Sequence, residues 1–217
     1  MQVPVVEKVL KLNDEIAALN RQTLKQAGIF TIDLIGAPGC GKTSLIEHTC
    51  RKLKDKVRIG VIVGDLTTRR DADRMAHFTD QVVQVNTGRG CHLEANHVRQ
   101  AMASLDLSRL DFLIIENVGN LVCPVGFDLG QDMKVGMFSV SEGDDKPAKY
   151  PYLVHESQVL LLNKMDLIGL VPFDRGIFHG DVRRLNPDVE LIEISILKDT
   201  GFERWLKWLE QHLRPRP

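Results

Sequence analysis

The sequence predicts an α/β fold, a doubly wound and mostly parallel sheet with helices on both faces. The first observation is that short apolar runs alternate with helical patterns along the chain. The second is that Val57–Val63 is apolar at nearly every position, as expected for a strand buried on both faces. The third is a glycine-rich loop, Gly36–Thr43, between an apolar run and a helical segment. We therefore expect one domain over residues 1–217, with an N-terminal helical segment over 1–27 and a frayed tail over 214–217.

The expected elements follow from periodicity and from turn residues. Pro4–Ala27 has apolar residues at mostly helical spacing and should form one or two amphipathic helices. Strands are expected where short apolar runs end in polar or glycine residues: Ile29–Ile35, Val57–Val63, Val82–Val85, Phe112–Ile115, Val135–Val140, Val159–Leu162 and Leu191–Ile196. Helices are expected at Ser44–Leu53, Asp71–Thr79, Leu93–Leu105, Phe173–Leu185 and Phe202–Leu213. The glycine-containing or charged stretches between them are expected to be loops: Thr87–His92, Asn117–Lys134 and Ser141–Tyr150.

The loop Gly36-Ala37-Pro38-Gly39-Cys40-Gly41-Lys42-Thr43 has the pattern of a P-loop in its expected context of strand, loop and helix. Backbone N–H groups of such a loop cradle phosphates, and glycines permit the close approach. Lys42 should reach the β- and γ-phosphates, and the Thr43 hydroxyl should ligate Mg²⁺. The nucleotide-binding residues expected here are Gly36, Pro38, Gly39, Cys40, Gly41, Lys42, Thr43 and Ser44. The chain is thus predicted to be a P-loop NTPase.

A second motif, Asn163-Lys164-Met165-Asp166, follows a predicted strand and resembles the N-K-x-D guanine-recognition motif of GTPases. The Asp166 carboxylate can accept two hydrogen bonds from guanine, whereas adenine would leave it unpaired, which costs about 1–3 kcal/mol. The Lys164 stem would cover one face of the base. Downstream of a P-loop, this motif favours a GTPase over a generic ATPase. The usual later S-A-K motif is replaced by Ser195-Ile196-Leu197, so that base contact is in question.

Acidic residues end two predicted strands and should face the phosphates, because ligands of such folds bind at the carboxyl ends of strands. Glu116-Asn117-Val118-Gly119 stands where GTPases carry a D-x-x-G switch. We expect Glu116 to hold Mg²⁺ directly or through water, and the Gly119 N–H to sense the γ-phosphate. Asp65 is a candidate for Mg²⁺ coordination or for positioning the attacking water. Lys42, Asp65 and Glu116 are therefore the candidate catalytic residues. Each carboxylate could instead only cap a turn.

Cys91, His92 and Cys123 form a candidate metal site. Cysteine thiolates and imidazole suit Zn²⁺, Ni²⁺ or copper. Adjacent Cys and His can converge on one ion only in a loop or at a helix start, and the glycines before Cys91 supply such a setting. Three ligands are one short of a closed tetrahedral site, so water or a second chain would complete it. Spacing alone leaves open that these are two buried thiols and a loop histidine.

Composition excludes several functional classes. The formal net charge of −1 argues against a nucleic-acid binder held by phosphate neutralisation. No apolar run approaches transmembrane length, and charges run through Met1–Asn20, which argues against a signal peptide. We therefore expect a cytoplasmic protein without membrane or nucleic-acid partners, whose four cysteines are thiols or metal ligands rather than disulfides.

Four longer blocks resemble the HypB-type GTPases, the nickel-insertion proteins of [NiFe]-hydrogenase maturation. The blocks are Thr87–Leu93, Glu116–Pro124, Phe127–Gly130 and Ser141–Pro147. The resemblance implies a slow GTPase of the signal-recognition/MinD-like branch that uses GTP or GDP with Mg²⁺ and dimerises with GTP. It also implies Ni²⁺ or Zn²⁺ binding by Cys91, His92 and Cys123 at the dimer interface. The implied partners are a small zinc-containing nickel-maturation protein and the hydrogenase large subunit.

Three alternatives remain at this stage. A urease-type nickel GTPase typically has a Cys-Pro-His motif, whereas Cys123-Pro124 is followed here by Val125. A small-molecule kinase would not need the motif at 163–166. A metal-storage scaffold whose GTP binding only sets its oligomeric state would carry the same residues, and steady-state GTP turnover would separate it from a GTPase.

Overall fold

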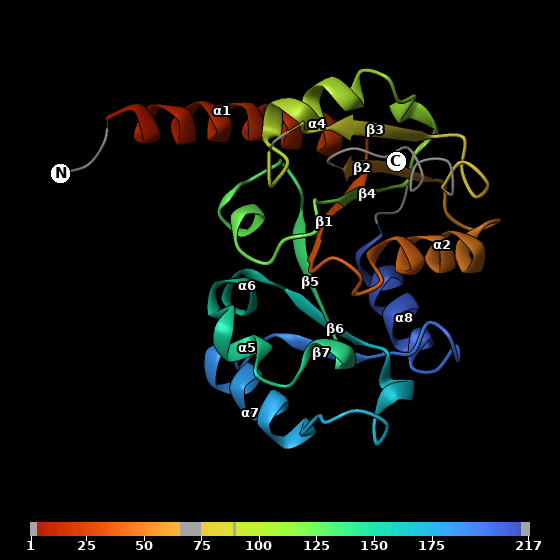
Figure 1. The fold of residues 1–217 in the computed structure, drawn as a ribbon. Coiled ribbons are helices and arrows are strands. Elements are labelled where there is room, and N and C mark those ends of the chain that lie inside the picture. The colour runs from red at the N-terminus through yellow and green to blue at the C-terminus, as the bar shows by residue number, and fades with distance from the viewer. Residues whose placement is uncertain (1–3, 66–74, 89, 214–217) are drawn as a thin grey trace.

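A computed structural model describes residues 4–65, 75–88 and 90–213 of the protein. Its centre is a parallel sheet of seven strands in the order β3-β2-β4-β1-β5-β6-β7 (Figure 1). The strands are β1 (Phe30–Gly36), β2 (Ile59–Asp65), β3 (Val82–Asn86), β4 (Phe112–Glu116), β5 (Met133–Ser139), β6 (Val159–Asn163) and β7 (Glu190–Glu193). The doubly wound α/β class that the sequence predicts is confirmed.

Helices cover both faces of the sheet. They are α1 (Pro4–Gln26), α2 (Lys42–Leu53), α4 (Ala95–Met102), α5 (Lys146–Lys149), α6 (Pro151–Glu156), α7 (Arg175–Leu185) and α8 (Phe202–His212). Short 3-10 turns are η1 (Leu107–Arg109), η2 (Cys123–Gly126), η3 (Val140–Glu142) and η4 (Met165–Leu167). Buried side chains of α2 and α8 share one apolar core with the strands, whereas those of α1, α4, α6 and α7 pack on the opposite face. Among the described residues, none of the helices combines the length and the apolar character that a membrane span needs.

Several element boundaries differ from the expected ones. The N-terminal segment is one helix, and its first half extends beyond the body of the molecule (Figure 1). The stretch expected as a charged loop contains η3 and α5, and α6 follows it without having been predicted. Pro147 and Pro151 stand in the first turns of α5 and α6, where proline is well tolerated, so they start helices here rather than mark a loop. The expected helix Asp71–Thr79 lies partly, and the expected frayed tail wholly, outside the described residues.

The strand order places the site. Because all strands are parallel, the carboxyl ends of β1, β2, β4, β5 and β6 lie at the same edge of the sheet. β1, which leads into the glycine loop, lies between β4 and β5. The segments after β3 and β4 therefore flank the glycine loop on one side, and those after β5, β6 and β7 flank it on the other.

Candidate nucleotide and metal site

The glycine loop has the backbone that phosphate binding requires. Gly41 has a φ of 111° and caps the N-terminus of α2, which begins at Lys42. A Cβ at Gly41 would lie 2.5 Å from the Asn163 Nδ2 atom, so both backbone conformation and space require glycine. Lys42 Nζ donates to the carbonyl oxygens of Gly36 and Ala37, at 3.0 and 3.2 Å, and so lies across the loop. The loop, its lysine and the helix N-terminus are thus arranged as a phosphate cradle.

The candidate Mg²⁺ ligands on the glycine loop and on β4 lie together. Thr43 Oγ1 donates to Glu116 Oε1 at 2.8 Å, and Glu116 is only 5% exposed. A hydroxyl and a carboxylate side by side at the phosphate cradle are the oxygen ligands that Mg²⁺ takes in nucleotide sites, so these residues fit the ion. The side chain of Asp65, the third candidate, lies outside the described part of the structure. Its strand β2 ends at the same edge of the sheet.

The guanine motif lies directly against the glycine loop. Asn163 Nδ2 donates to the Cys40 carbonyl at 2.9 Å, and Lys164 Nζ donates to the Gly39 carbonyl at 2.8 Å. A cavity of about 440 Å³ opens beside them and is lined by Gly39, Gly41, Ser44, Asn163, Lys164, Asp166, Leu167, Ile196 and Leu197. The cavity is large enough to admit a nucleobase, and Asp166 is on its wall.

Ser195 has a role that the sequence left in question. Its hydroxyl donates to Asp166 Oδ1 and accepts from the Lys198 backbone N–H at 3.2 Å. Although Ser195-Ile196-Leu197 departs from S-A-K, its serine still forms a hydrogen bond with Asp166, the aspartate of the guanine motif. Leu197 is 79% exposed and forms the outer wall of the cavity.

The structure brings Cys91, His92 and Cys123 together from two separate loops. One ligand atom from each lies within 4.8 Å of the others, and this is the only such group of three found among the described residues. The His92 ring stacks on Phe127, with centroids 3.9 Å apart. Thiolates and imidazole in this arrangement fit a soft or borderline divalent ion such as Zn²⁺ or Ni²⁺.

The pKa values of two residues of this cluster are shifted, and the shift at His92 agrees with a ligand role. Burial lowers the pKa of His92, which favours the neutral imidazole that a metal requires. The pKa of the Cys91 thiol is raised, mainly by a hydrogen bond with the Cys123 thiol and to a smaller extent by burial. For the other two cysteines burial is the largest cause, and it raises the pKa of Cys40 to about 11 and that of Cys50 to about 12, as expected for structural thiols.

The segment Glu116–Gly119 packs on the glycine loop and leads, through three intervening residues, to the candidate metal ligand Cys123. A Cβ at Gly119 would lie 2.9 Å from Pro38 Cγ and 3.1 Å from Pro38 N, so the segment packs closely on the glycine loop. Cys123 follows at the start of η2. The segment Glu116–Gly119 is therefore in direct contact with the glycine loop. Only three residues separate Gly119 from Cys123, a candidate metal ligand.

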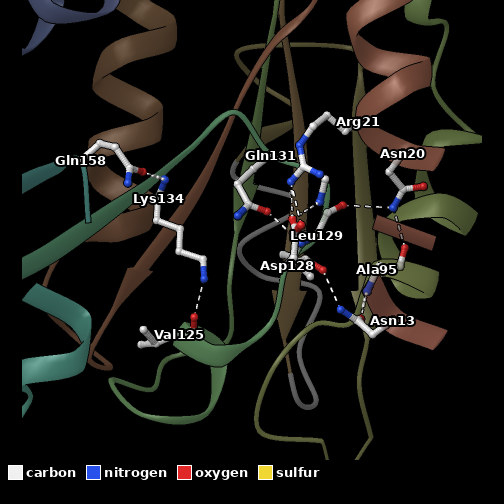
Figure 2. A network of polar contacts seen from close by, with 11 residues as sticks. Asn13, Asn20, Arg21, Ala95, Val125, Asp128, Leu129, Gln131, Lys134 and Gln158 are labelled. Atoms are coloured by element: carbon white, nitrogen blue, oxygen red, sulfur yellow. Dashed lines mark hydrogen bonds and ion pairs between the residues drawn. The ribbon is translucent and has the colours of Figure 1, made fainter. Parts of the chain in front are cut away.

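Helix α1 is bonded to the two segments that follow the candidate metal ligands in the chain, at Ala95 and at Asp128–Leu129 (Figure 2). Asn20 Nδ2 donates to the carbonyl oxygens of Ala95 and Leu129, at 2.8 and 3.0 Å, and Arg21 pairs with Asp128 at 2.7 Å. Lys134 Nζ, which is nearly buried, donates to the Val125 carbonyl in η2. The elements that carry the ligands therefore rest on a fixed polar frame.

Sequence reasoning gave no role to three polar residues of this region: Asn117, Asn120 and Glu142. Glu142 Oε1 accepts from Ser139 Oγ at 2.6 Å, and burial raises its pKa although Lys146, Lys164 and Lys42 lower it. Its position after β5 gave no signal, because the charged residues around it are typical of an exposed loop. Several of the scattered histidines have structural contacts, for example His97 Nδ1, which accepts from the Glu94 N–H at 3.0 Å.

Known proteins are similar to this chain in both sequence and fold. The family model described as CobW/HypB/UreG, nucleotide-binding domain, matches residues 30–193. A protein of Azotobacter vinelandii named hydrogenase maturation factor HypB is 44% identical over 207 residues, which are 95% of this chain and 68% of that protein. A crystal structure of hydrogenase maturation factor HypB from Archaeoglobus fulgidus has a TM-score of 0.88 at 36% identity and covers 93% of this chain and 98% of that one. A structure of HypB from Helicobacter pylori in complex with nickel has a TM-score of 0.87 at 32% identity, covering 94% and 99%.

Proposed function

Because the chain belongs to the CobW/HypB/UreG family of P-loop nucleotide-binding proteins, we propose that it is a GTP-hydrolysing metallochaperone. It binds nickel or zinc and assists nickel insertion into the large subunit of [NiFe]-hydrogenase. The names of its relatives support this substrate, and the nickel complex of the Helicobacter pylori protein supports this metal. The sequence resemblance alone supports placement in the signal-recognition/MinD-like branch.

One observation carries the proposal: the candidate metal ligands lie next to the segment that packs on the glycine loop. Gly119 approaches Pro38, and Cys123 follows on the same segment. A movement of this segment when the γ-phosphate leaves would therefore move a metal ligand. Metal affinity would then depend on the nucleotide, and by linkage nickel would change the affinity for GTP by the same factor.

The residues have distinct roles in the proposed reaction. The loop Gly36–Thr43 binds the phosphates, with Lys42 on the β- and γ-phosphates. Thr43 and Glu116 would hold Mg²⁺, which would neutralise charge that develops on the phosphates when the phosphoryl group passes to water. Asp65 would either coordinate the same ion or position the attacking water, and Asn163, Lys164 and Asp166 would select guanine. Turnover should be slow, as the resemblance implies.

The metal cluster supports a dimer in this proposal. Cys91, His92 and Cys123 supply three ligands per chain, one fewer than a closed tetrahedral site requires. A second copy of the same GTPase domain, facing the first when GTP is bound, would complete the coordination. The proposed setting is the cytoplasm, with a small zinc-containing nickel-maturation protein as a further partner.

A nickel titration tests the proposal. Metal bound per chain and molar mass are measured together with Mg²⁺–GDP and with a non-hydrolysable GTP analogue, for the wild type and for Cys123→Ala. We expect affinity and mass to depend on nucleotide in the wild type, and Cys123→Ala to lose the metal. Cys50→Ala is the matched control, because that thiol is buried against α8 and away from the cluster. Equal affinity in both states would contradict the coupling, and absence of steady-state GTP turnover with Mg²⁺ would favour a storage scaffold.

A further inference from the structure

Two asparagines that follow β4, Asn117 and Asn120, form hydrogen bonds with the two ends of the short segment Cys91–Leu93. We call Glu116–Asn120 the switch segment. Asn120 Nδ2 donates to the Cys91 carbonyl at 3.3 Å. The Leu93 N–H donates to Asn117 Oδ1 at 3.0 Å. The strip Cys91–Leu93 is thus fastened to Asn117–Asn120 by contacts that cross from one loop to another, 24 and 29 residues apart in the chain.

Asn117 is a fixed point. It is 1% exposed, and its Oδ1 also accepts from the Val118 N–H at 3.0 Å. Its Nδ2 donates to Asp33 Oδ1 on β1 at 3.0 Å. Both polar atoms of its side chain therefore have partners, and a rotated amide would set donor against donor. Breaking these buried bonds would leave unpaired polar groups in the core, which is costly.

Asn120 is a weaker and more accessible contact. It is only partly buried, its bond to Cys91 is long, and its Oδ1 accepts from the Val122 N–H at 2.9 Å. Val122 directly precedes Cys123. One side chain therefore joins the backbone of Cys91 to the backbone beside Cys123, the two residues whose thiols must approach the same ion.

We propose that Asn120 is a latch, and Asn117 its pivot, through which the nucleotide state sets the spacing of the metal ligands. Gly119, which packs on Pro38, lies between them in the chain. With the latch closed, as here, the three ligand atoms are gathered. When Gly119 shifts as the γ-phosphate leaves, the long exposed bond of Asn120 breaks before the buried bonds of Asn117, and Cys123 separates from Cys91. Asn120 is then a positioning residue that touches no ligand atom, and this inference rests on the function proposed above.

The test compares Asn120→Ala with Asn86→Ala. Asn86 Oδ1 accepts from the Gly88 N–H at 2.8 Å in the same loop, but that bond does not reach the switch segment. Ni²⁺ is titrated with Mg²⁺–GDP and with a non-hydrolysable GTP analogue, and the nickel–thiolate absorption band is recorded. In Asn120→Ala, the ratio of the two nickel dissociation constants should move toward one by about threefold to tenfold, the factor contributed by one hydrogen bond. In Asn86→Ala the ratio should stay as in the wild type.

Residue-resolved amide hydrogen exchange supplies a second measurement. The Leu93 N–H should stay protected in both nucleotide states, because Asn117 holds it. The Val122 N–H should exchange faster with GDP than with the analogue, because its acceptor Asn120 is released.

The outcomes separate this inference from the proposed function. If the wild type depends on nucleotide and Asn120→Ala keeps the full ratio, the latch is refuted and the coupled GTPase stands. If Asn120→Ala loses nickel in both states, Asn120 is needed to form the metal site itself. It then does not link nickel affinity to the nucleotide state, and the latch is also refuted. If the wild type binds nickel equally in both states, the latch is refuted together with the nucleotide coupling on which it rests, and steady-state GTP turnover still tests the GTPase.

Discussion

Asp33 should make the stability of the folded protein depend on pH. It lies in the middle of β1, is fully buried, and has Oδ1 bound by Asn117 Nδ2, whereas Oδ2 has no hydrogen-bond partner within the described part of the chain. Burial raises its pKa from 3.8 to about 7, although Asn117 and Lys134 lower it. Asp33→Asn removes the charge while keeping the Oδ1 acceptor.

The sign follows from the direction of this shift. Because the folded state holds the proton more tightly, the contribution of Asp33 to stability is fully present below pH 3.8 and is lost as pH rises through about 7. A shift of about three pKa units corresponds to roughly 4 kcal/mol, of which about 3 kcal/mol should be lost between pH 5 and pH 8. Relative to wild type, Asp33→Asn should therefore become more stable by about 3 kcal/mol over this interval.

Urea unfolding followed by tryptophan fluorescence measures this difference. Trp205 and Trp208 are buried on α8 and report loss of the core. The free energy of unfolding of Asp33→Asn minus that of the wild type is compared at pH 5 and pH 8, so that other titrating groups cancel. Asp55→Asn, which changes an exposed carboxylate, is the control. A difference that is the same at both pH values would refute the reasoning.

Three further predictions concern single contacts. Gly119→Ala would place a Cβ 2.9 Å from Pro38 Cγ, so affinity for a GTP analogue should fall at least about tenfold, as measured by fluorescent-nucleotide competition. Asp166→Asn offers guanine a donor in place of an acceptor, so GTP binding should weaken by about 1–3 kcal/mol while xanthosine triphosphate gains, and calorimetry of both nucleotides checks this. Lys134→Met leaves the Val125 carbonyl without its donor and should lower the free energy of unfolding by about 1–3 kcal/mol in urea titration, with unchanged stability contradicting the frame described above.

The motifs that the sequence predicted well are contiguous. A P-loop is a run of backbone conformations, so glycines at 36, 39 and 41 indicate it without knowledge of the rest of the fold. The guanine motif is likewise four consecutive residues after a strand. The residue types suggested that Cys91, His92 and Cys123 form a metal site, but spacing alone left this open, and the family resemblance supplied the stronger support, because nothing local joins two loops.

The contacts that the sequence could not predict join distant segments. Asn117 meets Asp33 across 84 residues, and Ser195 meets Asp166 across 29 residues. Such pairs depend on strand order and register, which no local pattern records. In the sequence, Asn117 and Asn120 have the character of ordinary loop residues, and their significance emerges only when β4 is placed between β2 and β1.

The order of strands has a consequence for how this protein can evolve. The candidate base-selecting segments follow β6 and β7, and the loops with the candidate metal ligands follow β3 and β4, on opposite sides of β1. Under the proposed function, a change of nucleotide specificity and a change of metal specificity would therefore need substitutions in different loops. Either property could then change during evolution while the other is kept.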